Sequence, residues 1–322
     1  MGADRPDDGE VPPDENPDRR DDQNDTGDQA GGPGNSRAET RTRQEYYADL
    51  RVTVSREESA AAQQATAEEQ AASEKWQQRV TESRSMWGEY QSKWPPAERP
   101  PVDRSEDAEG SWRGEGDRVL GPAENSRIEA ECDRIANLEK ERISPAMRAI
   151  ESQDPDRHLV GFDDRLKDHD RIKEKVYDKM EEFDYSAEKA MSCVSDTIRY
   201  TFEYRESRYT QGVWMDIERL KGEGFKLHTL KNFWSDENYK GINSQWIDPD
   251  TGQQFEVQFH TRISFEAKQL THDAYKRLRA EPDDELEKMV LKAFQREVSA
   301  DVPVPRGAAD IPDYSERDTD AR

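Results

Sequence analysis

Polar and apolar side chains alternate along residues 255–261, which read Phe-Glu-Val-Gln-Phe-His-Thr. Because successive side chains of a β-strand point to opposite faces, this order predicts a strand with an apolar face toward a core. Glu256, Gln258 and His260 then share the other face. An exposed antiparallel strand often carries such residues without any further role, so this strand alone does not establish a site.

A second acidic residue, Asp196, opens another run typical of a strand, residues 194–204. Magnesium prefers oxygen ligands and is commonly held by one or two carboxylates together with substrate phosphates, as pyrophosphoryl transfer requires. We therefore expect Mg²⁺ as the cofactor, with Asp196 and Glu256 as both its ligands and the catalytic acids. The alternative is that Asp196 caps its strand and does nothing more.

Basic residues crowd the segment 164–175, where they are Arg165, Lys167, Arg171, Lys173 and Lys175. Arginine offers a bidentate fork and lysine a point charge, so this segment could bind a triphosphate and neutralise charge that moves to a leaving nucleotide. Acidic residues are interleaved with them, namely Asp163, Asp164, Asp168, Asp170 and Glu174. A solvated helix with salt bridges between its turns fits this composition equally well.

A polar loop at residues 234–243 leads into a further predicted strand and presents Tyr239 beside Lys240. An exposed tyrosine can stack on a nucleobase while a neighbouring cation meets phosphate. Tyrosine is also an ordinary packing residue at the start of a strand, so both interpretations remain open.

The elements that must position these residues are confined to part of the chain. Hydrophobic residues make up 32% of the sequence and its net charge is −24, whereas globular domains are about 45–50% apolar. Residues 157–279 hold 21 basic and 23 acidic residues, so about −22 lies in the flanks. This acidity argues against coating of nucleic acid or of anionic membranes, although a local basic pocket could still bind one nucleotide.

Composition divides the chain into five segments. We expect a disordered acidic leader (1–44), an Ala- and Glu-rich helical segment (45–94), a linker (95–124), a folded domain (125–299) and a disordered tail (300–322). The helical segment lacks a leucine stripe, which favours a solvated or partner-dependent helix. Within the domain, periodicity predicts helices at 164–180, 264–278 and 284–298 and strands at 194–204, 225–230, 241–247 and 254–261. Helices, then strands, then helices is the layout of an α+β fold in which helices flank a sheet.

Neither a zinc site nor a membrane segment is indicated. Cys132 and Cys193 lack metal-ligand spacing, and either a disulfide or two reduced thiols is compatible with them. The sequence contains no run of about 18 apolar residues and no cleavable signal peptide. We expect no membrane partner and synthesis in the cytoplasm, with export by a specialised secretion system left open.

Taken in order, these pieces resemble the synthetase domain of the RelA/SpoT family, over roughly residues 157–279. The motif sequences are most similar to those of actinobacterial ATP nucleotide 3′-pyrophosphokinases and toxin-type small alarmone synthetases. The resemblance implies a nucleotidyltransferase-like α+β fold with a mixed, mainly antiparallel sheet of about five strands flanked by helices. It also implies transfer of pyrophosphate from ATP to the 3′-hydroxyl of a purine nucleotide. Other outcomes that it leaves open are a toxin that modifies the tRNA 3′ end and an inactive nucleotide-binding effector. An immunity protein is a further expected partner.

The resemblance also implies roles for individual residues. The ATP-binding residues would be Arg165, Lys167, Lys175 and Arg199, and the acceptor-binding residues would be Tyr239, Lys240, Asn243, Gln258, His260 and His272. Asp196 would bind the metal, and Glu256 would bind the metal or accept the proton of the acceptor hydroxyl. Three departures from the family pattern cluster around the acceptor side: Asn243 replaces a histidine, His260 replaces an arginine, and Arg199 follows Asp196 sooner than in the housekeeping enzymes of the family.

Overall fold

The computed structural model describes residues 69–96 and 107–316, all of which belong to one compact unit. The acidic leader expected at 1–44 and the first part of the helical segment, 45–68, lie outside the described residues.

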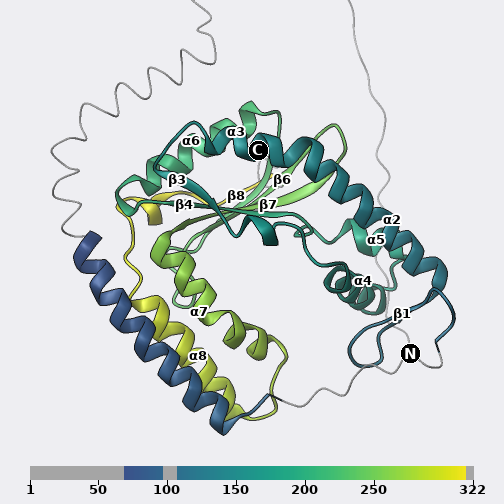
Figure 1. Cartoon of the computed structure of the whole chain (residues 1–322), viewed down its shortest axis with the longest axis horizontal. Coiled ribbons are helices and arrows are strands. Elements are labelled where there is room, and N and C mark those ends of the chain that lie inside the picture. Colours follow the sequence, from purple (N-terminus) through teal and green to yellow (C-terminus); the bar gives the residue numbers. More distant parts are fainter. Residues whose placement is uncertain (1–68, 97–106, 317–322) are drawn as a thin grey trace, which may run out of the picture. The chain divides into compact units, whose positions relative to one another are not determined.

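A six-stranded mixed sheet forms the centre of this unit (Figure 1). Its strands are β3 (Arg157–Val160), β4 (Arg199–Tyr204), β5 (Lys226–Asn232), β6 (Ile242–Ile247), β7 (Gln254–Thr261) and β8 (Tyr314–Ser315), in the order β3-β4-β7-β6-β5-β8. The pair β4–β7 is parallel and every other pair is antiparallel. The expected α+β class is confirmed. The two strands that periodicity did not predict are the short edges β3 and β8, which are too brief to show alternation.

Helices cover both faces of the sheet (Figure 1). They are α2 (Pro122–Leu138), α3 (Ser144–Glu151), α4 (His169–Phe183), α5 (Ala187–Ser192), α6 (Tyr209–Gly222), α7 (Arg262–Arg279) and α8 (Glu285–Ala300), with a π-helical turn at Glu139–Ile143. In Figure 1, α3 and α6 lie on one side of the sheet, and α4 and α7 lie on the other. The apolar face of β7 is fully buried on the α6 side, where Tyr209 donates a hydrogen bond to the carbonyl of Phe259. The polar face of β7 is thereby turned toward α7.

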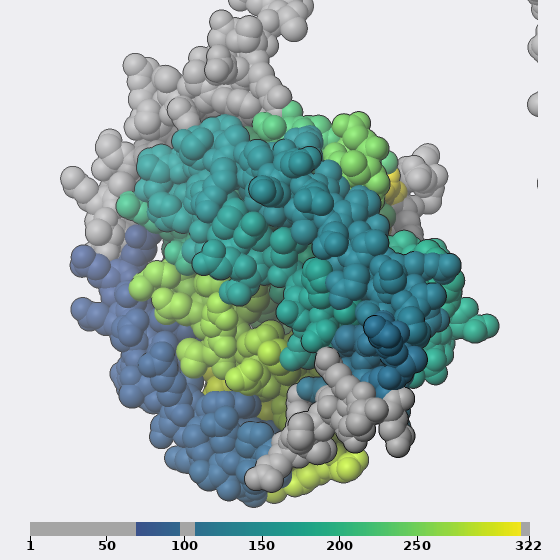
Figure 2. Space-filling model, turned by 45° about the vertical axis from the view of Figure 1, so that its right-hand side comes forward, coloured from purple at the N-terminus to yellow at the C-terminus, as the bar shows by residue number. Residues whose placement is uncertain are grey.

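The helix of residues 69–93 packs along α8 (Figure 1), and Figure 2 shows its blue atoms against green and yellow-green atoms of the C-terminal part of the chain. Trp87 lies 5.4 Å from Phe294 between ring centroids, and Tyr90 donates to the buried Glu287 carboxylate at 2.7 Å. This part of the expected helical segment is therefore a helix, and the surface that completes its packing is supplied by the same chain.

Two segments differ from the sequence-based expectation. The expected linker contains a small hairpin of β1 (Trp112–Arg113) and β2 (Val119–Leu120), whose Trp112 is buried and donates to Asp170 at 2.7 Å. The expected disordered tail is packed as far as residue 316, because Val302, Ala308 and Ile311 are buried and β8 pairs with β5. These apolar residues are widely spaced among Pro and Asp, so their burial depends on grooves that other elements form.

Cys132 and Cys193 are free thiols. Within residues 69–96 and 107–316, no helix is both long and apolar enough to cross a membrane.

Candidate active site

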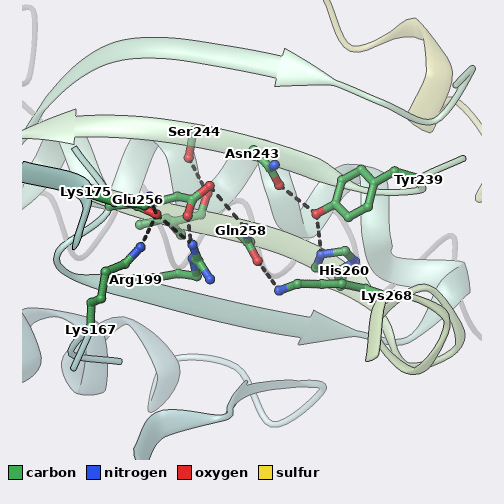
Figure 3. Close-up of polar contacts among 12 residues, drawn as sticks. Lys167, Lys175, Arg199, Tyr239, Asn243, Ser244, Glu256, Gln258, His260 and Lys268 are labelled. Carbon is green, nitrogen blue, oxygen red and sulfur yellow. Dashed lines mark hydrogen bonds and ion pairs between the residues drawn. The ribbon is translucent and has the colours of Figure 1, made fainter. Parts of the chain in front are cut away.

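The polar face of β7 is a buried surface. Glu256, Gln258 and His260 are 7%, 4% and 0% exposed, although the solvent-facing side of an ordinary sheet would leave them in water. Buried polar groups need hydrogen-bond partners, because an unsatisfied one costs about 1–3 kcal/mol. Their partners on other elements come from β4, α7 and the loop before β6, as Figure 3 shows for Arg199, Lys268 and Tyr239.

Arg199 joins the two acids that the sequence analysis singled out. It is in register with Glu256 on the neighbouring parallel strand. Its Nε donates to Glu256 Oε2 at 2.6 Å, and its Nη2 donates to Asp196 Oδ2 at 3.2 Å. The structure therefore brings both carboxylates to one guanidinium on the same face of the sheet.

Two lysines from the basic segment reach the same point. Lys167 and Lys175 both donate to Asp196, the latter at 2.8 Å to each oxygen. The backbone of Lys167 donates to the Thr197 carbonyl at 2.9 Å, which holds this segment beside the start of β4. Burial alone would raise the pKa of Asp196, but the two lysines outweigh it and hold that pKa well below its usual range. Burial lowers the pKa of Lys167 to about 8 despite its acidic partner.

Arg165 lies outside this cluster. Its Nε donates at 2.8 Å to Glu139, a fully buried carboxylate in the π-helical turn, and its guanidinium stacks over Phe162 at 4.4 Å. Its backbone carbonyl accepts a hydrogen bond from the Arg199 amide at 2.7 Å. Its contacts therefore position Arg199 and do not face the two acids.

Of the remaining members of the basic segment, Arg171 makes a salt bridge of the kind expected of a solvated helix, with Glu174 at 3.1 Å. Lys173 is buried and pairs with Glu129 of α2. The segment thus divides, since Lys167 and Lys175 turn to Asp196 and the others bind helix acids.

Tyr239 is held over the other end of the polar face. Its hydroxyl donates to Asn243 at 2.8 Å and lies 2.9 Å from His260 Nε2. The loop can pass close to the His260 ring because residue 241 is glycine, with a φ of +150°. A Cβ atom at this position would lie 2.7 Å from that ring. Burial, with Lys268 nearby, lowers the pKa of His260 well below its usual value, so the imidazole is neutral. His260 therefore brings no positive charge to the site.

Two predicted acceptor residues occupy different positions. The Lys240 ammonium donates to the carbonyls of Trp234 and Asp236, the first at 3.1 Å, and so it turns back onto its own loop. His272 is exposed and lines the cavity described next.

A cavity of about 730 Å³ opens beside these groups. Arg199, Glu256, Gln258 and Tyr239 line it from the sheet side, and α7 and α8 form the opposite wall. The sequence analysis did not single out Lys268, which lines the cavity and donates to Gln258 Oε1. Lys268 precedes His272 by four residues on a predicted helix, so the two side chains share a helix face, and this spacing could have identified Lys268 from the sequence.

The donor set at the two acids suits magnesium. Glu256 is in register with Gln245 on β6, whose Oε1 is buried and has no hydrogen-bond partner among the described residues. Two carboxylates and a nearby amide oxygen are hard oxygen donors of the kind that Mg²⁺ takes. No group of three or more His, Cys, Asp or Glu residues in the described ranges could hold a metal, so a bound ion here would need phosphate oxygens as well.

Comparison with known proteins gives a limited result. No protein-family profile and no curated protein matches the chain. Among solved structures, it is similar to a GTP pyrophosphokinase family protein from Streptococcus pneumoniae, with 16% identity and a TM-score of 0.39 over 54% of this chain and 88% of that one. Small alarmone synthetase 1 from Bacillus subtilis gives 12% identity and a TM-score of 0.38, over 54% of this chain and 90% of that one.

A third similar structure is the complex between the type VI effector Tas1 and its immunity protein, with 13% identity and a TM-score of 0.34 over 55% of this chain and 96% of the other. These structures are of the kind that the sequence motifs resemble. The roles of the site residues rest on the contacts described above.

Proposed function

We propose that this chain is an ATP-dependent pyrophosphokinase that transfers the β,γ-pyrophosphoryl group of ATP to the 3′-hydroxyl of a nucleotide. The acceptor oxygen bonds to the β-phosphorus, the bond between that phosphorus and the oxygen bridging it to the α-phosphate breaks, and AMP leaves with that oxygen. The observation that carries the proposal is the single guanidinium of Arg199, which holds Asp196 and Glu256 between two lysines and the cavity.

The donor side of the site consists of Lys167, Lys175 and Arg199. Without phosphate these cations neutralise the two acids. When a triphosphate enters, its oxygens compete for the same donors, which then lie where charge accumulates on the leaving AMP. Asp196 and Glu256 would hold magnesium, which supplies further neutralisation of the phosphates when it is bound. Positioning and charge stabilisation of this kind account for most of catalysis in phosphoryl transfer.

The acceptor side consists of Glu256 and Tyr239. Glu256 lines the cavity and accepts the proton of the attacking hydroxyl in this proposal. The Tyr239 ring also lines the cavity, while its hydroxyl is tied to Asn243 and His260, so the ring is fixed for stacking on a base. Burial and the nearby Glu256 raise the pKa of Tyr239, which keeps its hydroxyl protonated as a donor.

The test is chromatography of nucleotides after incubation of the protein with Mg²⁺, ATP and one acceptor at a time. GTP, ADP and deacylated tRNA cover the alternatives, and nucleotide binding without turnover is a further outcome. We expect equal amounts of AMP and a pyrophosphorylated acceptor. If no acceptor yields these products, the proposed function is wrong.

The matched variants are Glu256→Gln and Glu203→Gln. The first removes the proposed base while keeping its shape, and we expect it to lower the rate by about 10²–10⁴-fold. Glu203 lies on β4, in register with His260 and away from Arg199, so its variant should keep the rate. Glu256→Gln turning over like the parent protein would refute the assignment of Glu256.

A further inference from the structure

One acidic residue interrupts the apolar stripe of α2 and of the π-helical turn that follows it. Ile128, Cys132, Ile135 and Ile143 are buried on this stripe, and Glu139 lies among them and is fully buried. A buried carboxylate is costly unless charged and hydrogen-bonding groups surround it. Glu139 does not line the cavity beside β7, so the chemistry proposed above does not account for its burial.

Three donors converge on one oxygen of Glu139. Its Oε1 accepts a hydrogen bond from Arg165 Nε at 2.8 Å, and it also accepts from the hydroxyls of Tyr200 and Ser144. Burial and the hydrogen bond to Glu139 raise the pKa of Tyr200, so its hydroxyl stays protonated as a donor. The other oxygen, Oε2, is buried and has no hydrogen-bond partner within residues 69–96 and 107–316. The carboxylate is therefore held through Oε1, and it holds these three donors in return.

Two of the donors belong to segments that carry cations of the site. Arg165 precedes Lys167 by two residues, and Tyr200 directly follows Arg199 on β4. The two segments are joined by an antiparallel β-bridge, in which the Arg199 amide donates to the Arg165 carbonyl at 2.7 Å. On the other side of this bridge, the Lys167 amide donates to the Thr197 carbonyl at 2.9 Å. One carboxylate thus holds both segments of the bridge.

Glu139 acts from the face of the sheet opposite Arg199. Side chains alternate along β4, so Tyr200 points away from the face that carries the Arg199 side chain. Lys167 and Arg199 both donate to Asp196. A shift of the bridge would therefore move both cations together, relative to Asp196 and to any phosphate that they bind.

We propose that Glu139 is a positioning residue that aligns Lys167 and Arg199 for binding of the triphosphate. It does so through Arg165 and Tyr200, whose side chains it holds. This inference rests on the proposed function. A displacement of about 1 Å can cost about 10²-fold in rate even when the mutated residue is far from the chemistry. The π-helical turn that carries Glu139 is also of a kind that often occurs at functional sites.

The chain offers a matched control on the same strand. Tyr200 donates to Glu139, and Tyr204 donates to Asp216 at 2.6 Å. Both tyrosines and both acids are buried, and each acid also pairs with arginine. Asp216 lies on α6 and does not line the cavity. Variants of the two pairs therefore remove the same kind of contact, but only one pair holds the bridge.

The experiment measures kcat/KM for ATP and the acceptor KM in four variants. Glu139→Gln, which removes the charge, should lower kcat/KM for ATP by about 10–10²-fold and leave the acceptor KM unchanged. Tyr200→Phe, which loses only a hydroxyl and should fold, should show a loss of the same kind of about 3–10-fold. Asp216→Asn and Tyr204→Phe should keep both values, although all four variants should melt at lower temperatures. The split between ATP and acceptor separates positioning from a general loss of stability.

Tyr200→Phe with the parental kcat/KM for ATP, or losses of equal size in the Asp216 and Tyr204 variants, would overturn the inference and leave the proposed function intact. Absence of product with every acceptor would count against the proposed function instead. Calorimetric binding of inorganic tripolyphosphate then tests positioning alone, because this anion needs the cations and no acceptor. Weaker binding to Tyr200→Phe than to Tyr204→Phe supports the inference, and equal binding to the two, or none to the parent protein, overturns it.

Discussion

Replacement of Arg199 by lysine tests the bridge between the two acids. Arginine reaches Glu256 through Nε at 2.6 Å and Asp196 through Nη2 at 3.2 Å, using two corners of one planar group. Lysine keeps the charge but has a single nitrogen on a flexible stem, so it cannot hold both carboxylates in the same geometry. Loss of one preorganised donor at a reacting centre costs about 2.7–4 kcal/mol, or 10²–10³-fold in kcat. We expect Arg199→Lys to fall in this range.

Arg199→Gln removes both the positive charge and the two-donor geometry of the guanidinium. The two acids then lose the cation that they share, although Asp196 keeps Lys167 and Lys175. Loss of a nearby positive charge disfavours the ionised form of a carboxylate. We expect a larger loss of kcat than in Arg199→Lys and an acidic limb of the pH profile displaced to higher pH.

The assay is the initial rate of AMP formation against ATP concentration at saturating acceptor, together with thermal unfolding of each variant. Arg205→Lys is the matched control, because Arg205 directly follows β4 and makes an exposed ion pair with Asp156 at 3.2 Å. Its rate should remain within about twofold, since surface pairs contribute about 0–1 kcal/mol. Arg199→Lys with parental kcat and KM would show that the bridge is not needed, and the argument from its geometry would fail.

Three other predictions concern the acceptor ring, the donor lysine and the packed helix. Tyr239→Phe should keep the acceptor KM within about threefold but lower the melting temperature, because His260 loses a buried partner worth about 1–3 kcal/mol. Tyr239→Ala should raise the acceptor KM by about 5–150-fold, since stacking on a base contributes about 1–3 kcal/mol. Equal acceptor KM values for the two variants would exclude stacking. The Lys167 ammonium is charged below its pKa of about 8 and neutral above it, so kcat/KM for ATP should decline as pH rises through about 8; Lys167→Arg should displace the decline to higher pH, and an unchanged profile would exclude Lys167 as its origin. Trp87→Ala removes ring contacts with Tyr90 and Phe294 at 4.6 and 5.4 Å between centroids, each worth about 0.5–1.5 kcal/mol. Unfolding in urea should show that the free energy of unfolding falls by about 1–3 kcal/mol. An unchanged free energy of unfolding would mean that the helix of residues 69–93 adds little to stability.

Alternation made the central strands predictable. Residues 254–261 were predicted as a strand and form β7 with the same bounds, and residues 241–247 differ from β6 by a single position. Burial alternates with a period of two in β6. In β7 both faces are buried, although the apolar residues Phe255, Val257 and Phe259 all share one face. The shared face of Glu256, Gln258 and His260 followed directly from this pattern.

Helix α6 was missed although its signal was present. Tyr209, Val213, Ile217 and Leu220 recur at helical spacing and are all buried. Gly212 interrupts the run, and a glycine inside a helix lowers its propensity. The structure shows why glycine stands there, since a Cβ at this position would lie 2.6 Å from the Tyr204 ring. A close tertiary contact therefore overrode the local preference.

Side-chain partners could not be derived from the sequence. Arg165 and Lys167 are two positions apart in a run where every charge looked alike, yet one binds Glu139 and the other binds Asp196. Lys240 looked suited to phosphate but caps the carbonyls of its own loop. Which of several possible partners a flexible charged side chain meets depends on elements distant in sequence.

The sequence by itself determined the face of β7 that carries the polar groups, the presence of strands flanked by helices, and the candidate acids Asp196 and Glu256, because periodicity and residue type are local properties. The tertiary structure decided that Arg199 joins those acids and that α7 and α8 line the cavity beside them. Pairing of strands and packing of helices bring together residues that lie tens of positions apart, and local sequence holds no record of these distances.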